Sequence, residues 1–95
     1  MNNYETCRRQ LEAITDMVGD VADVRGYDDP KETIYQVVCL FRYPIGNCLA
    51  IDEYYNRIKQ MLGDWKLKLS VETAMDGTVI AKLSARTKYD DARFN

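Results

Sequence analysis

The stretch TIYQVVCLFRY, residues 33–43, decides how this chain folds. It is rich in β-branched and aromatic residues, which favour strands. Its odd-numbered positions form one continuous apolar face, made of Tyr35, Val37, Cys39, Phe41 and Tyr43. Successive side chains of a strand point to opposite faces of a sheet. The pattern therefore predicts a central strand whose odd-numbered face lies in the core.

Two amphipathic helices are predicted, one on each side of this strand. Residues 3–18 carry apolar side chains at steps of three and four, and a preceding asparagine can cap the helix start. Gly19 is expected to end this helix in a left-handed conformation. Residues 47–62 repeat the pattern and stop before Gly63, which predicts the second helix.

The clearest hairpin is predicted within residues 65–86, where two segments alternate apolar and polar side chains. A two-residue turn between them would oppose Val71 to Lys82, an apolar to a charged side chain. A three-residue loop at 75–77 instead opposes Val71 to Ala81 and keeps the apolar side chains on one face. We therefore expect that loop, with its glycine in the left-handed position of a bulged turn.

An internal repeat is suggested when the chain is shifted by 44 residues. ITDMVGD at 14–20 then aligns with IKQMLGD at 58–64, and the inward faces of the later strands coincide without a gap. Asp23 and Arg25 fall where the second half has leucines, so the first strand is expected to be less buried. Convergence is the alternative, because every helix end needs apolar residues followed by glycine.

These elements predict an α+β two-layer sandwich in the order αββαββ. The segment 21–27 alternates weakly and is expected to be an edge strand, joined to the central strand by a turn at 28–30. Two helices on one face of a four-stranded, mainly antiparallel sheet would bury the apolar stripes, and the halves would be related by an approximate twofold. The expected single domain, 1–95, comprises a first αββ half at 1–44, a second at 45–88 and a tail at 89–95.

Length and composition restrict the functions open to the chain. Its 95 residues fit one domain, and a hydrophobic fraction of 46% with a net charge of −2 is typical of a globular protein. The sequence has neither an apolar run long enough to span a bilayer nor a secretory signal, so we expect no membrane association. Three cysteines without CxxC spacing fit a reducing compartment, which predicts a cytoplasmic protein.

The absence of histidine from the sequence argues against an enzyme. It removes the usual general base of Ser-His-Asp and Cys-His hydrolases and the usual ligand of catalytic zinc. A structural zinc site would need all three thiolates and a carboxylate, which is a rare ligand set. The sequence also has no glycine-rich phosphate loop. We therefore expect no enzymatic activity, no catalytic residue, no bound metal and no cofactor.

A basic cluster is predicted on the solvent side of the C-terminal hairpin. Its members are Lys66, Lys68, Lys82 and Arg86, extended by Lys88 and accompanied by Ser70 and Ser84. Lys66 would lie opposite Arg86, and like charges across a ladder are destabilising. This pairing indicates an anionic ligand, either a phosphate backbone or an acidic protein face. The alternative is that the lysines only keep an exposed sheet soluble and block edge pairing.

The second candidate surface is the even-numbered face of the 33–43 strand. Its residues are Ile34, Gln36, Val38, Leu40 and Arg42. In a two-layer domain this face meets water, yet three of its five side chains are large and aliphatic. Such a strip with polar neighbours is typical of a protein interface. The alternative is that the tail from 87 to 95 folds Tyr89 and Phe94 back over it.

The sequence thus favours a binding function over catalysis. The segment 16–32 carries six acidic residues against two basic ones, an acidic rim that can steer a partner. We expect a protein-binding module, an inhibitor or adaptor that occludes a partner surface, of the size and class of inhibitors that phages and mobile elements make. The same surface could form a homodimer. The alternative function is a nucleic-acid-binding domain that uses Lys66, Lys68, Lys82 and Arg86.

Overall fold

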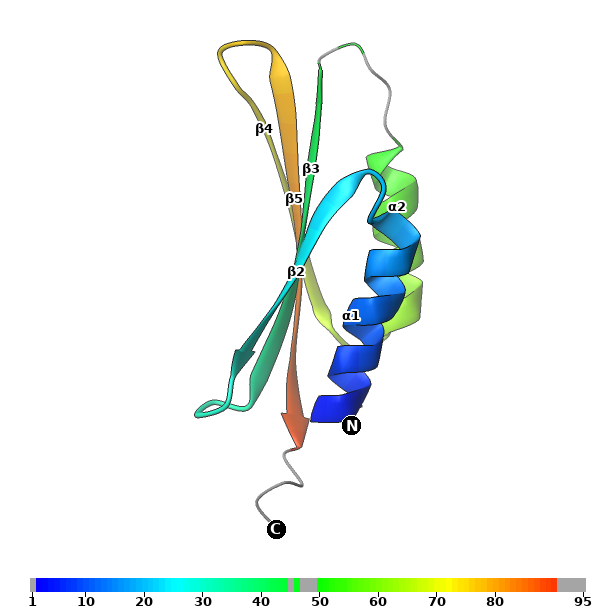
Figure 1. Cartoon of the computed structure of the whole chain (residues 1–95), viewed down its shortest axis with the longest axis vertical. Helices are drawn as coiled ribbons and strands as arrows, with labels where there is room; N and C mark the ends of the chain where they lie inside the picture. The colour runs from blue at the N-terminus through cyan, green and yellow to red at the C-terminus, as the bar shows by residue number, and fades with distance from the viewer. Residues whose placement is uncertain (1, 45, 47–49, 91–95) are drawn as a thin grey trace.

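The structure is a computed structural model that describes residues 2–44, 46 and 50–90. The elements are β1 (Asn2–Asn3), α1 (Tyr4–Val18), β2 (Ala22–Asp29), β3 (Ile34–Pro44), α2 (Ile51–Leu62), β4 (Lys66–Thr73) and β5 (Thr78–Asp90). Apart from the two-residue β1, this is the predicted order αββαββ. Both helices lie on the same side of the sheet (Figure 1). The predicted α+β two-layer architecture is confirmed.

The sheet runs in the order β2-β3-β5-β4, and each of these neighbours is antiparallel. The short β1 joins β5 in parallel, next to Tyr89. The odd-numbered residues of β3 and β5 face the helices, and most of them are buried. They pack against Cys7, Ile14 and Val18 of α1 and Ile58 and Leu62 of α2 to form the core.

Helix α1 begins as the sequence predicts and ends differently. The backbone N–H of Thr6 donates to Oδ1 of Asn3 at 2.7 Å, so Asn3 is the N-cap. Gly19 at the other end has φ −60°, a right-handed conformation, so the expected left-handed end is wrong. The chain keeps its right-handed turn because the N–H of Val21 still donates to the carbonyl of Val18.

Helix α2 is shorter than predicted. It begins at Ile51 after Ala50, whereas the prediction started it at residue 47; residues 47–49 lie outside the described part of the chain. Asp52 and Glu53 occupy its first turn, where the helix dipole favours acidic side chains. Gly63, with φ 62°, ends it with positive φ, the geometry that had been expected at Gly19.

The β4–β5 hairpin has the predicted register. Val71 pairs with Ala81, Leu69 with Leu83 and Leu67 with Ala85. The N–H of Ala74 donates to the carbonyl of Thr78 at 2.7 Å, which closes a three-residue loop at 75–77. Gly77 has φ 87°, as the bulged turn requires.

The loop of the β2–β3 hairpin is one residue longer than that of its counterpart, the β4–β5 hairpin. Strand β2 extends to Asp29, so the turn lies at 30–33 rather than at 28–30. Because this loop has four residues, it pairs residues of opposite parity, and Val24 faces Cys39. Asp23 and Arg25 consequently point away from the helices. The repeat without a gap is therefore wrong for β2. The expectation that β2 is less buried than its counterpart β4 is also wrong, because each strand has two half-buried and six exposed residues.

The central strands β3 and β5 follow the 44-residue repeat, which the β2–β3 hairpin does not. Cys39 of β3 pairs with Leu83 of β5, and these two positions are equivalent under the 44-residue shift. Val37 pairs with Ala85 on one side and Phe41 with Ala81 on the other, which are also equivalent pairs. The register of β3 and β5 is therefore symmetric about Cys39 and Leu83, as an approximate twofold between two αββ halves requires.

Candidate binding surface

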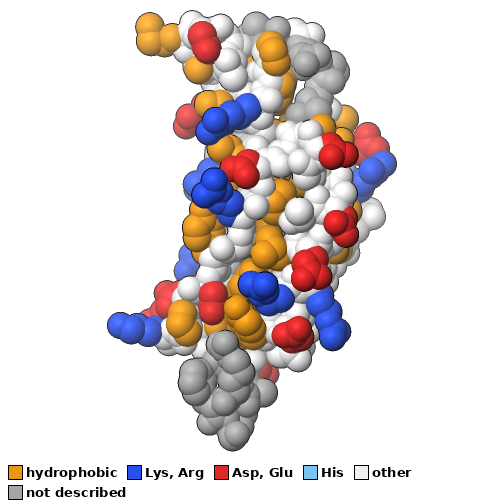
Figure 2. Space-filling view, viewed as in Figure 1, with side chains coloured by type: hydrophobic (Ala, Val, Ile, Leu, Met, Phe, Trp, Pro, Cys, Tyr) orange, Lys and Arg blue, Asp and Glu red, His pale blue; other side chains and the backbone are white. Residues whose placement is uncertain are grey.

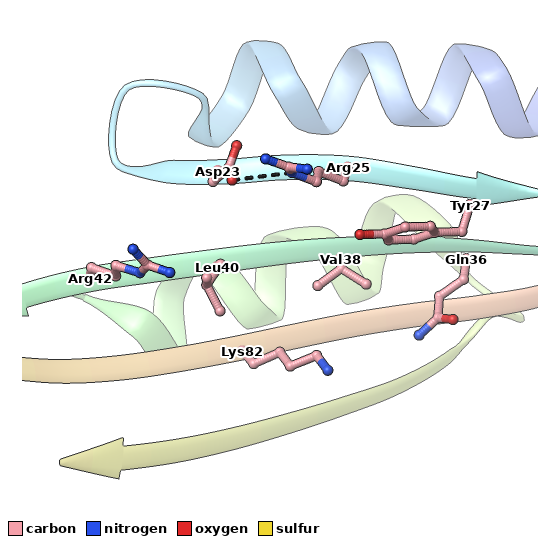
Figure 3. Close-up of a pocket in the computed structure, with 8 residues that line it drawn as sticks. All are labelled: Asp23, Arg25, Tyr27, Gln36, Val38, Leu40, Arg42 and Lys82. Carbon is pink, nitrogen blue, oxygen red and sulfur yellow. Dashed lines mark hydrogen bonds and ion pairs between the residues drawn. The ribbon is translucent and has the colours of Figure 1, made fainter. Parts of the chain in front are cut away.

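The sheet surface opposite the helices is the candidate functional site, and we call it the open face. It consists of the odd-numbered residues of β2 and the even-numbered residues of β3, β5 and β4. Within the described ranges no helix or strand lies over it (Figure 1). Its central part is a shallow depression lined by Asp23, Arg25, Tyr27, Gln36, Val38, Leu40, Arg42 and Lys82 (Figure 3).

The even-numbered strip of β3 lies along the middle of the open face. Ile34, Gln36, Val38 and Leu40 are half-buried, and Arg42 is exposed. Val38 has Arg25 on the neighbouring β2 and Ser84 on β5 as its cross-strand partners. Because β3 is a central strand, these apolar side chains are flanked on both sides rather than left at an edge.

The tail does not place Tyr89 over this strip. Tyr89 belongs to β5 and is buried on the helix side, because its odd position in the strand points there. Its ring centroid lies 5.6 Å from that of Tyr4, and its hydroxyl donates to Oδ1 of Asp28 at 2.5 Å. The alternative that the tail folds Tyr89 over the open face is therefore wrong. Phe94 lies outside the described residues.

The basic cluster has the geometry expected for it. Lys66 pairs directly with Arg86, and Lys68 pairs with Ser84. Lys82 lies between Ser70 of β4 and Leu40 of β3. The side chains of Lys66, Lys68, Lys82 and Arg86 are all exposed. They line a second shallow depression that shares Gln36 and Lys82 with the first.

The apolar strip and the basic cluster therefore form one surface. Strand β3 pairs directly with β5, which places Gln36 beside Arg86 and Leu40 beside Lys82. The sequence indicated two separate candidate sites because it does not show which strands are neighbours.

Charge is segregated between the two layers. The open face carries the basic residues Arg25, Arg42, Lys66, Lys68, Lys82, Arg86 and Lys88 against the acidic residues Asp23, Asp29, Glu72 and Asp90. The helical side carries more acidic than basic residues, and Figure 2 shows acidic side chains along the helices with some lysines and arginines among them. A chain with net charge −2 thus presents a positively charged face.

Few of these charges are neutralised within the chain. Nε of Arg25 lies 3.3 Å from Oδ2 of Asp23, and both side chains are largely exposed. No other ion pair forms on the open face among the residues that the structure describes. Such an exposed pair contributes little stability, about 0–1 kcal/mol. The remaining cations are therefore available to an anionic partner.

Three members of the open face were missed as site residues in the sequence. Asp23, Arg25 and Tyr27 of β2 line the central depression, and Tyr27 is 53% exposed. Their outward direction follows from the four-residue turn that sets the β2 register. The signal that was present is the charge at positions 23 and 25, which is unfavourable in a core.

The buried thiols do not resemble reactive groups. Burial raises the pKa of Cys7 and of Cys39 to about 11, so both are protonated at neutral pH. No group of three or more potential ligands that could hold a metal ion occurs in the described ranges. The helices in the described part of the chain are too short or too polar to cross a membrane.

Comparison of the chain with family models, with curated proteins and with solved structures found no match.

Proposed function

We propose that the chain is a non-enzymatic protein-binding module whose open face binds an acidic protein surface. The observation that carries this proposal is the arrangement of Val38 and Leu40 in the middle of the sheet, with cationic side chains on both flanking strands. An apolar centre with a charged rim is how specific protein interfaces are built. The rim would select an acidic partner and accelerate its association. Binding at this face would occlude the matching surface of the partner.

The alternative, nucleic-acid binding, is favoured by the row in which Arg86 lies between Gln36 and Lys66. Three features of the open face favour a protein instead. The apolar strip cannot bind a phosphate backbone, and the acidic side chains of the open face would repel phosphate groups. Tyr27 is also the single aromatic side chain on the described open face, whereas binders of single strands stack bases on several.

Several observations support a binding role over catalysis. The open face is shallow, and enzymes that act on small molecules enclose most of their ligand. The buried thiols of Cys7 and Cys39 have raised pKa values, which is the opposite of what a nucleophile needs.

The test is capture of proteins from an extract of the natural host on immobilised protein, with a nuclease-treated arm. We expect wild-type protein to retain a discrete acidic protein after nuclease treatment. Val38→Glu should weaken that interaction about tenfold or more, because it puts a buried carboxylate at the interface centre. Val38→Thr, which keeps the branched shape without charge, is the matched control and should retain most of the binding.

Replacing Lys66, Lys68, Lys82 and Arg86 together by serine separates the two functions. A protein partner should still be retained, with slower association and a weaker dependence on salt. If the retained material is nucleic acid, nuclease removes it and the quadruple variant loses it altogether. Loss of the retained material on nuclease treatment would refute the proposal, and so would its complete loss in the quadruple variant. A partner that Val38→Glu still binds at full strength would also refute it.

A further inference from the structure

The outer edge of β4 is long and unpaired. Strand β4 has eight residues, contains neither proline nor glycine, and no described strand pairs with its outer side. Natural proteins usually protect such an edge with a bulge, a proline, a covering segment or charged side chains, and of these the described part of β4 has only the charged side chains, among them Lys66 and Lys68. An edge left in this state can pair with a strand of another chain.

The hydrogen bonds of the hairpin show which residues face this edge. Ala74 and Thr78 form a hydrogen-bonded pair, and such pairs alternate along an antiparallel ladder. The even-numbered residues of β4 therefore bond to β5. The odd-numbered residues Leu67, Leu69 and Val71 direct their backbone N–H and C=O groups to the free edge.

Two side chains of β4 lack a matching neighbour, and a third, apolar side chain is exposed. Lys66 pairs with Arg86, another cation, and Glu72 pairs with the apolar Ile80. Neither Lys66 nor Glu72 forms an ion pair with any residue that the structure describes. Val71 is 57% exposed although it points to the helix side, because the hairpin extends beyond the helices (Figure 1).

We propose that two copies of the chain associate edge to edge through β4, antiparallel, about a twofold axis at Leu69. In this register Lys66 of each copy lies opposite Glu72 of the other. Leu67 lies opposite Val71, and Leu69 opposite its own equivalent. The dimer supplies a carboxylate next to the Lys66 and Arg86 pair and covers the exposed valine. Both helical layers lie on one side, and the two open faces join into one continuous surface.

Neighbouring registers fit less well. A shift of the pairing by an odd number of residues would oppose apolar to charged side chains and misalign the backbone donors. An axis at Lys68 would oppose Lys68 to itself. An axis at Ser70 would place Glu72 opposite Lys68, which already has the neutral Ser84 as its neighbour. Lys66 and Arg86 would then have no carboxylate beside them.

The test is the mass of the purified, nuclease-treated protein by sedimentation over a concentration series, at about 0.1 M ionic strength. We expect a monomer–dimer equilibrium for the wild type. Lys66→Glu and Glu72→Lys should each raise the dimer dissociation constant about tenfold or more, since each opposes like charges twice. The double variant that carries both changes should restore it. Lys68→Glu, with the same charge change one position along the same face, should have a smaller effect.

A second variant tests the backbone pairing. Val71→Pro removes an N–H that the free edge offers, while it leaves the bonds between β4 and β5 in place. It should be monomeric with an unchanged circular dichroism spectrum. Val38→Glu should dimerise normally, so failure of the dimer and failure of the proposed open-face function are distinguishable.

Several outcomes would overturn the dimer. The wild type could remain monomeric up to about 1 mM, the scale of negligible affinity. The mass could grow without limit, which would show pairing of β4 with a different edge. The double variant of Lys66→Glu and Glu72→Lys could fail to recover the wild-type dimer affinity. Lys68→Glu, instead of Lys66→Glu, could be the change that restores the dimer in the Glu72→Lys variant.

Discussion

At Gly26 the absence of a side chain lets β2 lie directly on the core. A Cβ atom there would lie 2.5 Å from the hydroxyl of Tyr35 and 2.8 Å from Cδ2 of Leu11. Tyr35 is buried, and its ring packs edge-on against Tyr4 and Trp65. The space required by a methyl group is therefore already filled.

Gly26→Ala should lower the free energy of unfolding by about 1–3 kcal/mol, the usual cost of overpacking. Chemical denaturation measures this change. Tyr35→Phe is the matched partner, because it removes the hydroxyl that the new methyl group meets. The variant with both changes should be more stable than the sum of the two single effects predicts. Additive effects would show that Tyr35 is not the obstacle.

At the level of the elements, the β4–β5 loop fixes which side chains face the core. Gly77 holds φ 87°, a conformation that costs most other residues about 1–2 kcal/mol. Oδ1 of Asp76 also accepts a hydrogen bond from the N–H of Thr78 at 2.9 Å and supports the turn. The three-residue loop therefore depends on both residues.

Gly77→Ala should lower the free energy of unfolding by about 1 kcal/mol, because alanine is strained in the left-handed region. Gly77→Asn should cost less, since asparagine tolerates that region better. Thermal or chemical denaturation of the two variants compares them directly. Equal losses in both would mean that backbone conformation is not the cause.

For the whole molecule, the buried thiols predict how stability depends on pH. Burial raises the pKa of Cys39 from 9.0 to about 11, and burial together with nearby Asp28 does the same for Cys7. Below pH 9 the thiols are protonated in both the folded and the unfolded state. As the pH rises from 9 to about 11, only the unfolded state loses these protons, so the folded state is destabilised.

We therefore expect the free energy of unfolding to fall as the pH is raised from 9 to about 11. Urea titrations at several pH values measure the slope. Cys39→Ala is the comparison, because it removes one of the two thiols with a raised pKa, Cys7 and Cys39, while other titrating groups remain. Its slope should be smaller than that of the wild type, and an equal slope would contradict the assignment to Cys39.

Only part of the molecule follows the approximate twofold symmetry. The central β3–β5 pair is symmetric about Cys39 and Leu83, whereas the β2–β3 loop is one residue longer than the β4–β5 loop. This difference turns Asp23 and Arg25 onto the open face. Whether the two αββ halves arose by duplication stays a prediction.

The amino-acid sequence alone determined the elements and most of their inward faces. Helical and strand periodicities are local properties, so the stripe at 3–18, the alternation at 33–43 and the three-residue loop at 75–77 could be predicted without a structure. The parity of Val71 and Ala81 even fixed the register of one hairpin, because a wrong register would have buried a lysine.

Only the tertiary structure decided which strands are neighbours, which way β2 faces and what Tyr89 packs against. Pairing of β3 with β5 joins residues that are far apart in the sequence, and local patterns do not specify such contacts. That pairing unites the apolar strip with the basic cluster into one open face. The odd position of Tyr89 in β5 points its side chain to the helix side, but its packing against Tyr4 depends on where the first helix lies, which local patterns do not specify.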